Sequence, residues 1–522
     1  MRRPIVLHPF LFALYPALAL LAVNVAWVTP HQVVRSVLTS LALAFALYAA
    51  LWLILRNPLK AALVTSLLIV PLFGYGQMYD GLRAAGLGTA ARHRYLAPAL
   101  LALLALGTVA ILRTRRDLRP LNHALNLIAA LSLALPMLTL LGSEADRLTS
   151  PAADLPEESV PGLAWADPGP PPDIYLIVLD AYAREDVLQT VFNYENAPTL
   201  DALRELGFFV ADGSRANHAQ TGLSLASLLN MDYVGELLPQ ADPDSANRDA
   251  LWQLVQHSLV RRSLESLGYS TVAFATGLEG TELQDADAFL APQTDPVRFD
   301  LRGLTAFESM LLDGTGIRAM TDLSVALPEF FPDSEAPFDA HRDRINFVFD
   351  QLPVLPSTPG PKFVVAHVIA PHPPFVFGPN GEARAPDGPF TLGDAGEPAA
   401  DSEYIGAYRD QIRYIDKRLV ETVQAILKNS ERPPIIILQA DHGPEGKHAS
   451  VSYPQERMTI LNALYLPDGG DRSLYSTITP VNTFRLILRE YFQGEVELLP
   501  DRVLYSEYRR PYDFIDLTDE IE

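Results

Sequence analysis

Five apolar runs before residue 143 constrain this chain more than any other feature of its sequence. Each run approaches the ~20 residues that a helix needs to cross a bilayer, and a peptide backbone can cross hydrocarbon only as a helix or a closed barrel. Arg2 and Arg3 precede the first run, as in a signal peptide, but four further runs follow it, and we interpret it as an uncleaved helix. The sequence therefore predicts a bundle of five transmembrane helices, at about residues 9–29, 34–55, 61–79, 95–112 and 121–142.

The short loops between these runs predict the orientation. With the N-terminus inside, the inner loops carry eight Lys or Arg and the outer loops five, which agrees with the positive-inside rule. Five spans then place the rest of the chain outside, so we expect a multi-pass protein of the bacterial cytoplasmic (inner) membrane with a periplasmic or extracellular C-terminal domain. No span carries an acid at mid-membrane, which favours a simple anchor. The alternative is that the helices also shape a groove for lipid access.

The remainder of the chain is acidic. Residues 1–150 carry thirteen Lys and Arg against four Asp and Glu, and the whole-chain charge of −22 therefore leaves −31 for the other 372 residues. This charge argues against nucleic acid as a partner, because affinity for a polyanion comes largely from Lys and Arg. The chain has no cysteine, which excludes zinc fingers, iron–sulfur clusters, disulfides and a catalytic thiol. An anionic substrate would need local positive charge, for which a bound metal is the obvious source.

We divide the chain into three parts. Residues 1–142 form the five-helix transmembrane domain, residues 143–172 form a linker rich in Pro and acids, and residues 173–522 form the catalytic domain. In the last part, wholly apolar runs alternate with amphipathic helical stretches, which is typical of a parallel sheet covered by helices on both faces. We therefore predict an α/β domain with a mostly parallel sheet and strands at Ile174–Leu179, Ser270–Ala275, Phe363–Ile369 and Pro434–Gln439.

Acids and histidines gather at the expected strand ends, where open α/β sheets place their sites. Asp180 ends the first run, Asp441 and His442 end the last, and the run that carries His367 leads to His372 in a Pro-His-Pro turn. Carboxylate and imidazole groups that meet at one edge suit a divalent metal. Each residue alone also has an ordinary interpretation, Asp180 as a helix cap and His367 as a core histidine, but these interpretations do not require one shared edge.

Thr221 is the candidate nucleophile. It precedes an apolar-periodic stretch, which predicts a place in the first turn of a helix, where free N–H groups and the helix dipole favour negative charge. A helix-capping threonine is the alternative. A threonine hydroxyl becomes a good nucleophile only when a base or a metal lowers its pKa, and a cation held by Asp180, Asp441 and His442 would do so.

The ordered set of residues resembles the alkaline phosphatase and sulfatase superfamily. It comprises an aspartate after the first strand, a hydroxyl about forty residues later, a His-Pro turn and then Asp-His-Gly. The stretch YRDQIRYIDKRLVETVQAIL before that last motif is similar to the helix at the same place in sulfatase-type domains. With five preceding spans, the layout resembles lipoteichoic acid synthases and bacterial phosphoethanolamine transferases. The likeness covers residues 173 to about 490.

The resemblance implies roles for individual residues. Asp180, Thr221, Asp441 and His442 would hold a divalent metal (Mn, Zn, Mg or Ca), with Thr221 as the attacking group. Two further catalytic candidates are His372, in a turn similar to the His-x-Pro-Phe turn of such synthases, and His448, which would protonate a leaving group or hold a second metal. A solvated loop histidine is the alternative for His448. The substrate-binding candidates are Asn217, His218 and His367.

The sequence departs from these relatives in three ways. Formylglycine-dependent sulfatases need a C/S-x-P-x-R motif, whereas this chain reads Thr221-Gly222-Leu223-Ser224-Leu225. Phosphoethanolamine transferases usually have disulfides in the soluble domain, and none can form here. The first metal ligand of lipoteichoic acid synthases is typically Glu, and here it is Asp180. We interpret Asp416 as structural, because basic residues flank it on a helix.

The hypothesis that results is a membrane-anchored, metal-dependent phosphotransferase or phosphodiesterase. Thr221 would attack a lipid phosphodiester, the phospholipid being the donor and a glycan hydroxyl or water the acceptor. Two alternatives are a non-catalytic envelope scaffold of the same fold and a sulfuric ester hydrolase that works without formylglycine. Residues 276–340 and 376–403 are expected to choose the substrate, as a lid or as surface insertions.

Overall fold

The protein folds into two compact units in the computed structural model. The described residues are 4–25, 30–87, 92–149, 159–165, 167, 169–292, 305–321, 336–384, 390–392, 401–444 and 453–521. The first unit holds those that fall within 1–148, 301–337 and 387–391. The second unit holds those that fall within 149–300, 338–386 and 392–522. The chain therefore returns to the first unit after it has begun to build the second.

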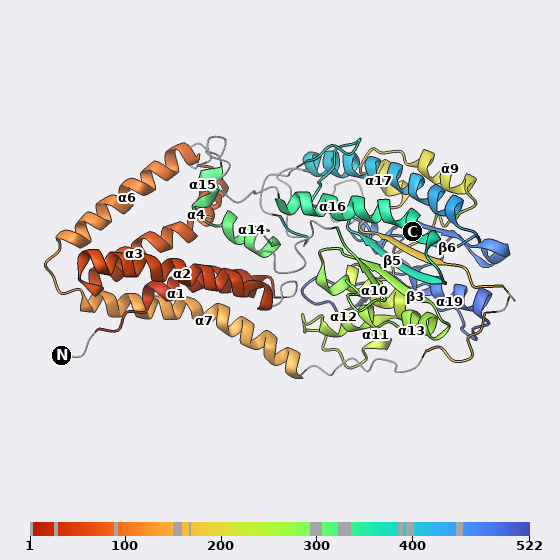
Figure 1. The fold of residues 1–522 in the computed structure, drawn as a ribbon, viewed down its shortest axis with the longest axis horizontal. Helices are drawn as coiled ribbons and strands as arrows, with labels where there is room; N and C mark the ends of the chain where they lie inside the picture. The colour runs from red at the N-terminus through yellow and green to blue at the C-terminus, as the bar shows by residue number, and fades with distance from the viewer. Residues whose placement is uncertain are drawn as a thin grey trace. The chain divides into compact units, whose positions relative to one another are not determined.

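The first unit is helical (Figure 1). Its helices in the described ranges are α1 (His8–Val23), α2 (Pro30–Leu55), α3 (Pro58–Phe73), α4 (Tyr75–Ala84), α6 (His93–Arg113), α7 (Arg119–Thr149), α14 (Ala306–Asp313) and α15 (Ile317–Thr321). Three segments are long and apolar enough to cross a bilayer, namely Val33–Leu55, His93–Arg113 and Arg119–Ala145.

The expected number of five spans is not confirmed. Helices α3 and α4 are bent by 49° at Gly74 and count as a fourth span only if the pair is taken together. Helix α1 has 16 residues, which at about 1.5 Å per residue gives ~24 Å, less than the ~30 Å of a hydrocarbon core. The apolar runs that predicted the first and third spans are therefore real, but one forms a short helix and the other a broken one.

Helices α14 and α15 come from the sequence range that we assigned to the catalytic domain, yet they pack within the first unit. The ring of Phe307 is buried among apolar side chains of α1 and α2, and Leu311 packs against the same cluster. Helix α14 packs there because it has an apolar face. In the sequence, the acidic residues around this face obscure it.

The second unit is built on a seven-stranded sheet with the strand order β2-β7-β6-β1-β5-β3-β4. Strand β1 lies at the centre, parallel to β5 and β6 on either side, and β3 and β4 continue the parallel part. Strand β7 runs antiparallel to β6 and to β2. The bounds are β1 (Ile174–Leu179), β2 (Phe209–Val210), β3 (Ser270–Phe274), β4 (Ala288–Leu290), β5 (Lys362–Val368), β6 (Ile435–Gln439) and β7 (Asn462–Tyr465). The predicted mostly parallel α/β sheet is confirmed.

Helices cover both faces of this sheet, which explains why its central strands are apolar throughout. All residues of β1, β5 and β6 are buried. Figure 1 shows α9, α16 and α17 on one face and α10, α12 and α13 on the other. The helices of the unit are α8 (Glu185–Thr190), α9 (Ala197–Glu205), α10 (Thr221–Asn230), α11 (Val234–Leu237), α12 (Asp249–Gln256), α13 (Leu259–Ser266), α16 (Ala336–Gln351), α17 (Asp401–Asn429), α18 (Tyr453–Met458) and α19 (Pro480–Phe492).

Short elements complete the second unit. The 3₁₀ helices η1, η4 and η5 connect the larger elements, and a hairpin-like pair of strands forms a small second sheet near the C-terminus. Their bounds are η1 (Glu279–Thr281), η4 (Leu352–Ser357), η5 (Pro467–Ser473), β8 (Leu504–Tyr505) and β9 (Ile515–Asp516).

Candidate active site

Three adjacent parallel strands bring the candidate residues to one edge of the sheet. Asp180 directly follows β1, and Asp441 and His442 directly follow Ala440 at the end of β6. In the register of the sheet, Val178 lies opposite His367 of β5 on one side and opposite Gln439 of β6 on the other. The carboxyl ends of β1, β5 and β6 therefore meet where the sequence pattern predicted.

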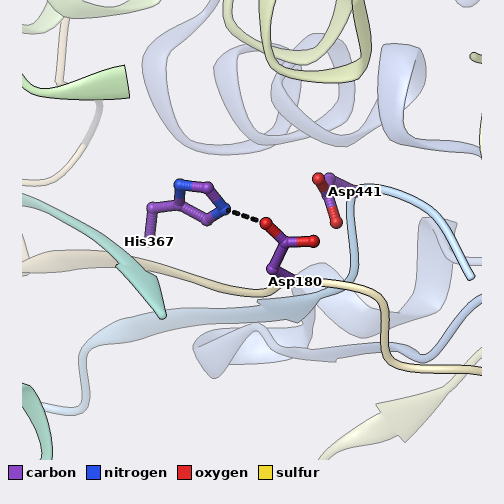
Figure 2. Close-up of side chains that lie close together, drawn as sticks. All are labelled: Asp180, His367 and Asp441. Atoms are coloured by element: carbon purple, nitrogen blue, oxygen red, sulfur yellow. Dashed lines mark ion pairs between the residues drawn. The ribbon is translucent and has the colours of Figure 1, made fainter. Parts of the chain in front are cut away.

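Asp180, His367 and Asp441 form a buried cluster with the composition of a metal site (Figure 2). One ligand atom from each lies within 4.8 Å of the others. Nε2 of His367 is 3.2 Å from Oδ2 of Asp180, as the dashed line in Figure 2 marks. Among the described residues, no hydrogen-bond donor reaches Oδ1 of Asp180 or Oδ2 of Asp441, although both atoms are buried. Two buried carboxylates this close repel each other, and a divalent cation would relieve that repulsion.

His442 faces the same two carboxylates. Its Nδ1 donates to the carbonyl of Gly443 at 2.9 Å, and since a carbonyl can only accept, the proton of a neutral ring lies on Nδ1. Nε2 is then an acceptor, 3.2 Å from Oδ2 of Asp441 and 3.8 Å from Oδ1 of Asp180. Acceptors that face one another need a donor or a cation between them, and Nη2 of Arg457, 3.2 Å from Nε2, is one such donor. Ligands of one tetrahedral metal ion with ~2.0–2.1 Å bonds lie about 3.3 Å apart; the 3.2 Å distance to Asp441 fits this spacing, and the 3.8 Å distance to Asp180 exceeds it.

Thr221 completes this group. Its Oγ1 lies 3.1 Å from Nε2 of His442 and therefore has the place of a further ligand or of a hydrogen-bond donor. Thr221 is the first residue of α10, as expected, and no side chain caps that helix end. The N–H groups of the first helical turn thus remain available for an anion beside the hydroxyl. The structure brings together all four residues that the resemblance proposed as metal ligands.

The charges of the site act on the carboxyl group of Asp180. Burial alone would raise its pKa, but the neighbouring imidazole groups of His372, His367 and His442 outweigh burial and hold the pKa well below its ordinary value. A lowered pKa favours the ionised form of this carboxyl group, which is the form that a metal site would require.

The sequence matches the family model "Sulfatase" over residues 172–484. The chain belongs to the sulfatase family. The match covers β1 to α19 and contains every site residue described above. No curated protein matches the sequence.

Three solved structures to which this chain is similar are 12–13% identical to it. The C-terminal periplasmic domain of EcEptC from Escherichia coli in complex with Zn is 13% identical, covers 70% of this chain and 97% of its own, and has a TM-score of 0.44. The integral membrane lipooligosaccharide phosphoethanolamine transferase A from Neisseria meningitidis is 12% identical, covers 92% and 94%, and has a TM-score of 0.39. An alkaline phosphatase superfamily protein from Vibrio parahaemolyticus is 12% identical, covers 70% and 81%, and also has a TM-score of 0.39.

In this sulfatase-family chain, Gly443 shows why the Asp-His-Gly turn requires glycine. A Cβ at this position would lie 2.0 Å from the carbonyl oxygen of Glu456. The N–H of Gly443 donates to the carbonyl of Arg457 at 2.7 Å. The turn that carries Asp441 and His442 is thus held directly against the backbone that precedes β7.

His372 lies beside the metal-site cluster. Its backbone N–H donates to the carbonyl of Asp180 at 3.0 Å, and its Nδ1 donates to the carbonyl of Pro373 at 2.5 Å. The side-chain amide of Gln411, on α17, donates to the carbonyls of Pro371 and His372 and fixes this turn. The structure therefore brings His372 next to Asp180, whereas His448 lies outside the described residues.

Asn217 and His218 lie in the turn before Thr221, but their side chains have other partners. The amide of Asn217 donates to Oγ1 of Thr479 and to the carbonyl of Arg502. The ring of His218 is buried against Tyr233 and Phe514, and burial lowers its pKa to about 3. The structure does not bring these two side chains to the metal-site cluster, and their contacts instead hold the turn that leads into α10.

Arg457 is a buried residue of the site that the sequence analysis did not single out. Its Nε donates to the carbonyl of Ala219 at 2.7 Å, its Nη1 to the carbonyl of Gly443 at 3.2 Å, and its Nη2 lies 3.2 Å from Nε2 of His442. One guanidinium therefore connects the turn before Thr221 with the turn that carries His442. No local motif marks Arg457, because the sequence between His442 and Arg457 has no regular pattern.

His341 of α16 is a second residue that the sequence analysis did not single out. It is buried, and burial together with the charges of Arg344 and His372 lowers its pKa to about 3. His341 is close enough to Asp180 for the carboxylate to act on it electrostatically. No sequence pattern marks His341, since a histidine in an amphipathic helix follows no metal-ligand spacing.

Asp416 is structural, as expected, but not through its basic neighbours. It accepts hydrogen bonds from the hydroxyls of Tyr182 at 2.6 Å, Tyr194 at 2.7 Å and Thr199 at 3.0 Å. Burial raises the pKa of Asp416 to about 6 despite these donors. The carboxyl group thus joins α17 to the segment between β1 and α9.

Proposed function

We propose that this sulfatase-family protein is a membrane-anchored, metal-dependent phosphotransferase or phosphodiesterase in which Thr221 is the nucleophile. The observation that carries the proposal is the Thr221 hydroxyl, 3.1 Å from Nε2 of His442, at the uncapped N-terminus of α10. The proposed site thereby combines a nucleophile, an anion-binding helix end and a set of metal-ligand side chains. Such a combination suits displacement at phosphorus.

The metal would be held by Asp180, Asp441 and His442, with Thr221 as the fourth ligand. The facing acceptors on His442 and Asp441 and the buried Oδ1 of Asp180 support this assignment. His367, which we first considered for substrate binding, contacts the other oxygen of Asp180 and would orient this ligand or hold a second ion. When bound, a divalent cation would lower the pKa of the attacking hydroxyl and neutralise charge on the phosphoryl oxygens.

The chain's own residues account for binding and transfer. The N–H groups at the start of α10 would bind the non-bridging oxygens, and His372 would contact the same phosphate. In the first step Oγ1 of Thr221 forms a bond to phosphorus, the bond from phosphorus to the lipid oxygen breaks, and the hydroxyl proton leaves overall with the lipid alcohol. In the second step the oxygen of a glycan hydroxyl or of water forms a bond to phosphorus, the bond from phosphorus to Oγ1 of Thr221 breaks, and the acceptor's proton returns overall to Oγ1.

A lipid donor is supported by the N-terminal helices. Three of the described helices, or four spans with the bent pair, are apolar and long enough to sit in a bilayer. A domain that is tethered to them works close to lipid head groups. We propose that the catalytic domain lies outside the bacterial cytoplasmic membrane, which requires that an odd number of spans follows an inner N-terminus.

Sulfate-ester hydrolysis is the second candidate, because the family model is named for it. The position of the formylglycine precursor is occupied by Thr221, however, and threonine cannot be converted into formylglycine. Any sulfatase activity would therefore have to use the threonine hydroxyl itself. A non-catalytic scaffold would have no use for the hydroxyl, the acids and the histidine in this arrangement.

Intact-mass spectrometry of the full-length protein tests the proposal. The protein in detergent is incubated with Mn²⁺ or Zn²⁺ and vesicles that contain phosphatidylglycerol and phosphatidylethanolamine, and Thr221→Val and Thr221→Ser are treated in parallel. We expect a mass increase in the wild type and in Thr221→Ser but not in Thr221→Val, and the size of the increase distinguishes phosphoglycerol from phosphoethanolamine. A mass increase on Thr221→Val equal to that of the wild type would show that Thr221 is not the nucleophile. The absence of both an adduct and bound metal would favour the scaffold.

A further inference from the structure

The bend between α3 and α4 is filled by a segment from the middle of the catalytic sequence. At a break in a membrane helix, backbone N–H and C=O groups lose their partners within the helix, and hydrocarbon offers none. Here the N–H of Gly76 donates to the carbonyl of Gly314 at 2.9 Å. The N–H of Gly316 donates to the carbonyl of Leu72 at 2.7 Å. Residues 314–316 thus supply a hydrogen-bond partner on each side of the break.

The close approach at this break depends on glycine. A Cβ on Gly76 would lie 2.6 Å from the carbonyl oxygen of Asp313 and 2.7 Å from Cα of Gly314. Neither contact can be relieved by a side-chain rotation, because both partners are backbone atoms. Gly81, on the same helix, has open space at the corresponding point. The absence of a side chain at Gly76 is therefore what lets the two backbones meet.

Polar and apolar contacts flank the backbone pairing. Glu308 caps the N-terminus of α14 in a capping box with Thr305 and pairs through both carboxylate oxygens with Arg35 of α2. Arg318 contacts Asp80 of α4 at 3.1 Å and lies over the ring of Tyr79.

The apolar part of the contact is the ring of Phe307. It is 1% exposed and packs among Ala17, Leu21 and Val33. Its partners lie in the last turns of α1 and the first turns of α2, and Leu140 near the end of α7 packs against the same cluster. The last turns of α1, the first turns of α2 and the ends of α3 and α7 thus form one side of the helical unit. Residues 305–321, which come from the sequence of the catalytic domain, pack on this side.

We propose that residues 305–321 are a second anchor, which binds the N-terminal helices and completes their broken span. The anchor holds the catalytic domain on the membrane unit independently of the linker that follows α7. The inference does not rest on the proposed chemistry, since it concerns binding between two parts of this chain. Its consequence is that the catalytic domain has at least two points of attachment to the membrane helices, which restricts its movement away from them.

Cleavage of the linker tests the anchor. A protease recognition sequence is placed between residues 150 and 158 of the full-length protein, an affinity tag is placed at the N-terminus, and the protein is reconstituted and cut. We expect the C-terminal fragment to stay with the tagged helices after cleavage. In Gly76→Ala, release of the fragment should increase by about tenfold or more, because the added methyl group overpacks the contact between two backbones.

Matched variants separate the anchor from general effects on folding. Gly81→Ala makes the same chemical change on α4 in open space, and it should retain the fragment like the wild type. Phe307→Ala removes the buried ring from the other partner and should release the fragment, even if Gly76→Ala proves hard to produce. Complete release of the wild-type fragment upon cleavage, or equal retention by Gly76→Ala and Gly81→Ala, would overturn the proposal. Either result is read from binding alone and leaves the question of phosphotransfer untouched.

Discussion

Oγ1 of Thr221 lies 3.1 Å from Nε2 of His442, although 221 residues of sequence separate the two. One residue begins a helix and the other follows a strand, and the sheet brings both ends to a single point. The proton on Nδ1 of His442 is held by the carbonyl of Gly443, so Nε2 is left to face the hydroxyl. Thr221 is the first residue of α10, and the N-cap position before it belongs to Gln220, so the Thr221 hydroxyl does not cap this helix.

The first prediction concerns this hydroxyl. Thr221→Val keeps the shape of the side chain and removes the nucleophile, so kcat/KM for a phosphodiester should fall by about 10³-fold or more. Thr221→Ser keeps the hydroxyl and should retain measurable turnover. Steady-state kinetics with a chromogenic phosphodiester give the comparison. Wild-type turnover by Thr221→Val would mean that another group attacks phosphorus.

A second prediction concerns metal and stability. Because two buried carboxylates face each other, Zn²⁺ or Mn²⁺ should stabilise the wild type and raise its thermal midpoint. At a hundredfold excess of metal over Kd, the unfolding free energy should increase by up to about 3 kcal/mol. Asp441→Asn should lose most of this shift, and a chelator should reverse it in the wild type. Asp173→Asn is the control, since Asp173 is a partly buried acid at the opposite end of β1, paired with Lys362. A metal-induced shift of equal size in Asp441→Asn would contradict the assignment.

Gly443 provides a steric test of the Asp-His-Gly turn. In Gly443→Ala the new methyl group would lie 2.0 Å from the Glu456 carbonyl, so the turn must move and both activity and thermal stability should fall. Gly406→Ala is the matched control, because that position, on α17, has open space. Alanine also favours a helix over glycine by about 1 kcal/mol, so the control should be neutral or slightly stabilising. Differential scanning fluorimetry and the same turnover assay measure both effects.

Arg457 should act as a positioning residue. Lysine keeps the positive charge but cannot reach Ala219, Gly443 and His442 at once, as the guanidinium does. Arg457→Lys should therefore lower kcat by about tenfold to a hundredfold with little change in KM. The exposed Arg489→Lys serves as the control. Equal losses in thermal midpoint and rate, with KM raised as well, would instead indicate that Arg457 only supports the fold.

Asp416 predicts a pH dependence of stability. Its pKa is about 6 in the folded protein and near its ordinary value of 3.8 in the unfolded chain. The folded state therefore binds this proton more tightly, and the resulting stabilisation is present below about pH 4 and is lost as the pH rises through 6, a change on the order of 3 kcal/mol. Asp416→Asn, which stays neutral, should not show this loss. The thermal midpoint of Asp416→Asn minus that of the wild type should increase from pH 4 to pH 7. If this difference stayed constant with pH, the prediction would be contradicted.

Much of the fold and part of the site follow from sequence alone. The four predicted strands are present, because strands buried on both faces must be apolar throughout and are short enough to be told from helices. Asp180, Asp441 and His442 could be placed at one edge because the carboxyl ends of parallel strands meet there. The start of α10 at Thr221 followed from the apolar periodicity after it.

Other features depended on contacts between distant segments. Arg457 contacts His442, and His341 interacts electrostatically with Asp180, only because the fold brings distant segments together, and neither residue has a local pattern that marks it. Asp416 is satisfied by hydroxyls from other segments rather than by its helical neighbours, because burial removes it from the charges that the sequence places beside it.

The membrane half shows the same division. The sequence determined which runs are apolar, since hydropathy is a property of local composition. Only the tertiary structure decided that one run is broken at Gly74 and that residues 314–316 pair with the two sides of the break. Hydrogen bonds between segments more than two hundred residues apart leave no periodic trace in either segment. The chemical groups at each strand end were therefore determined by sequence alone. Tertiary packing decided which of these side chains meet at one site and which segment returns to the N-terminal helices.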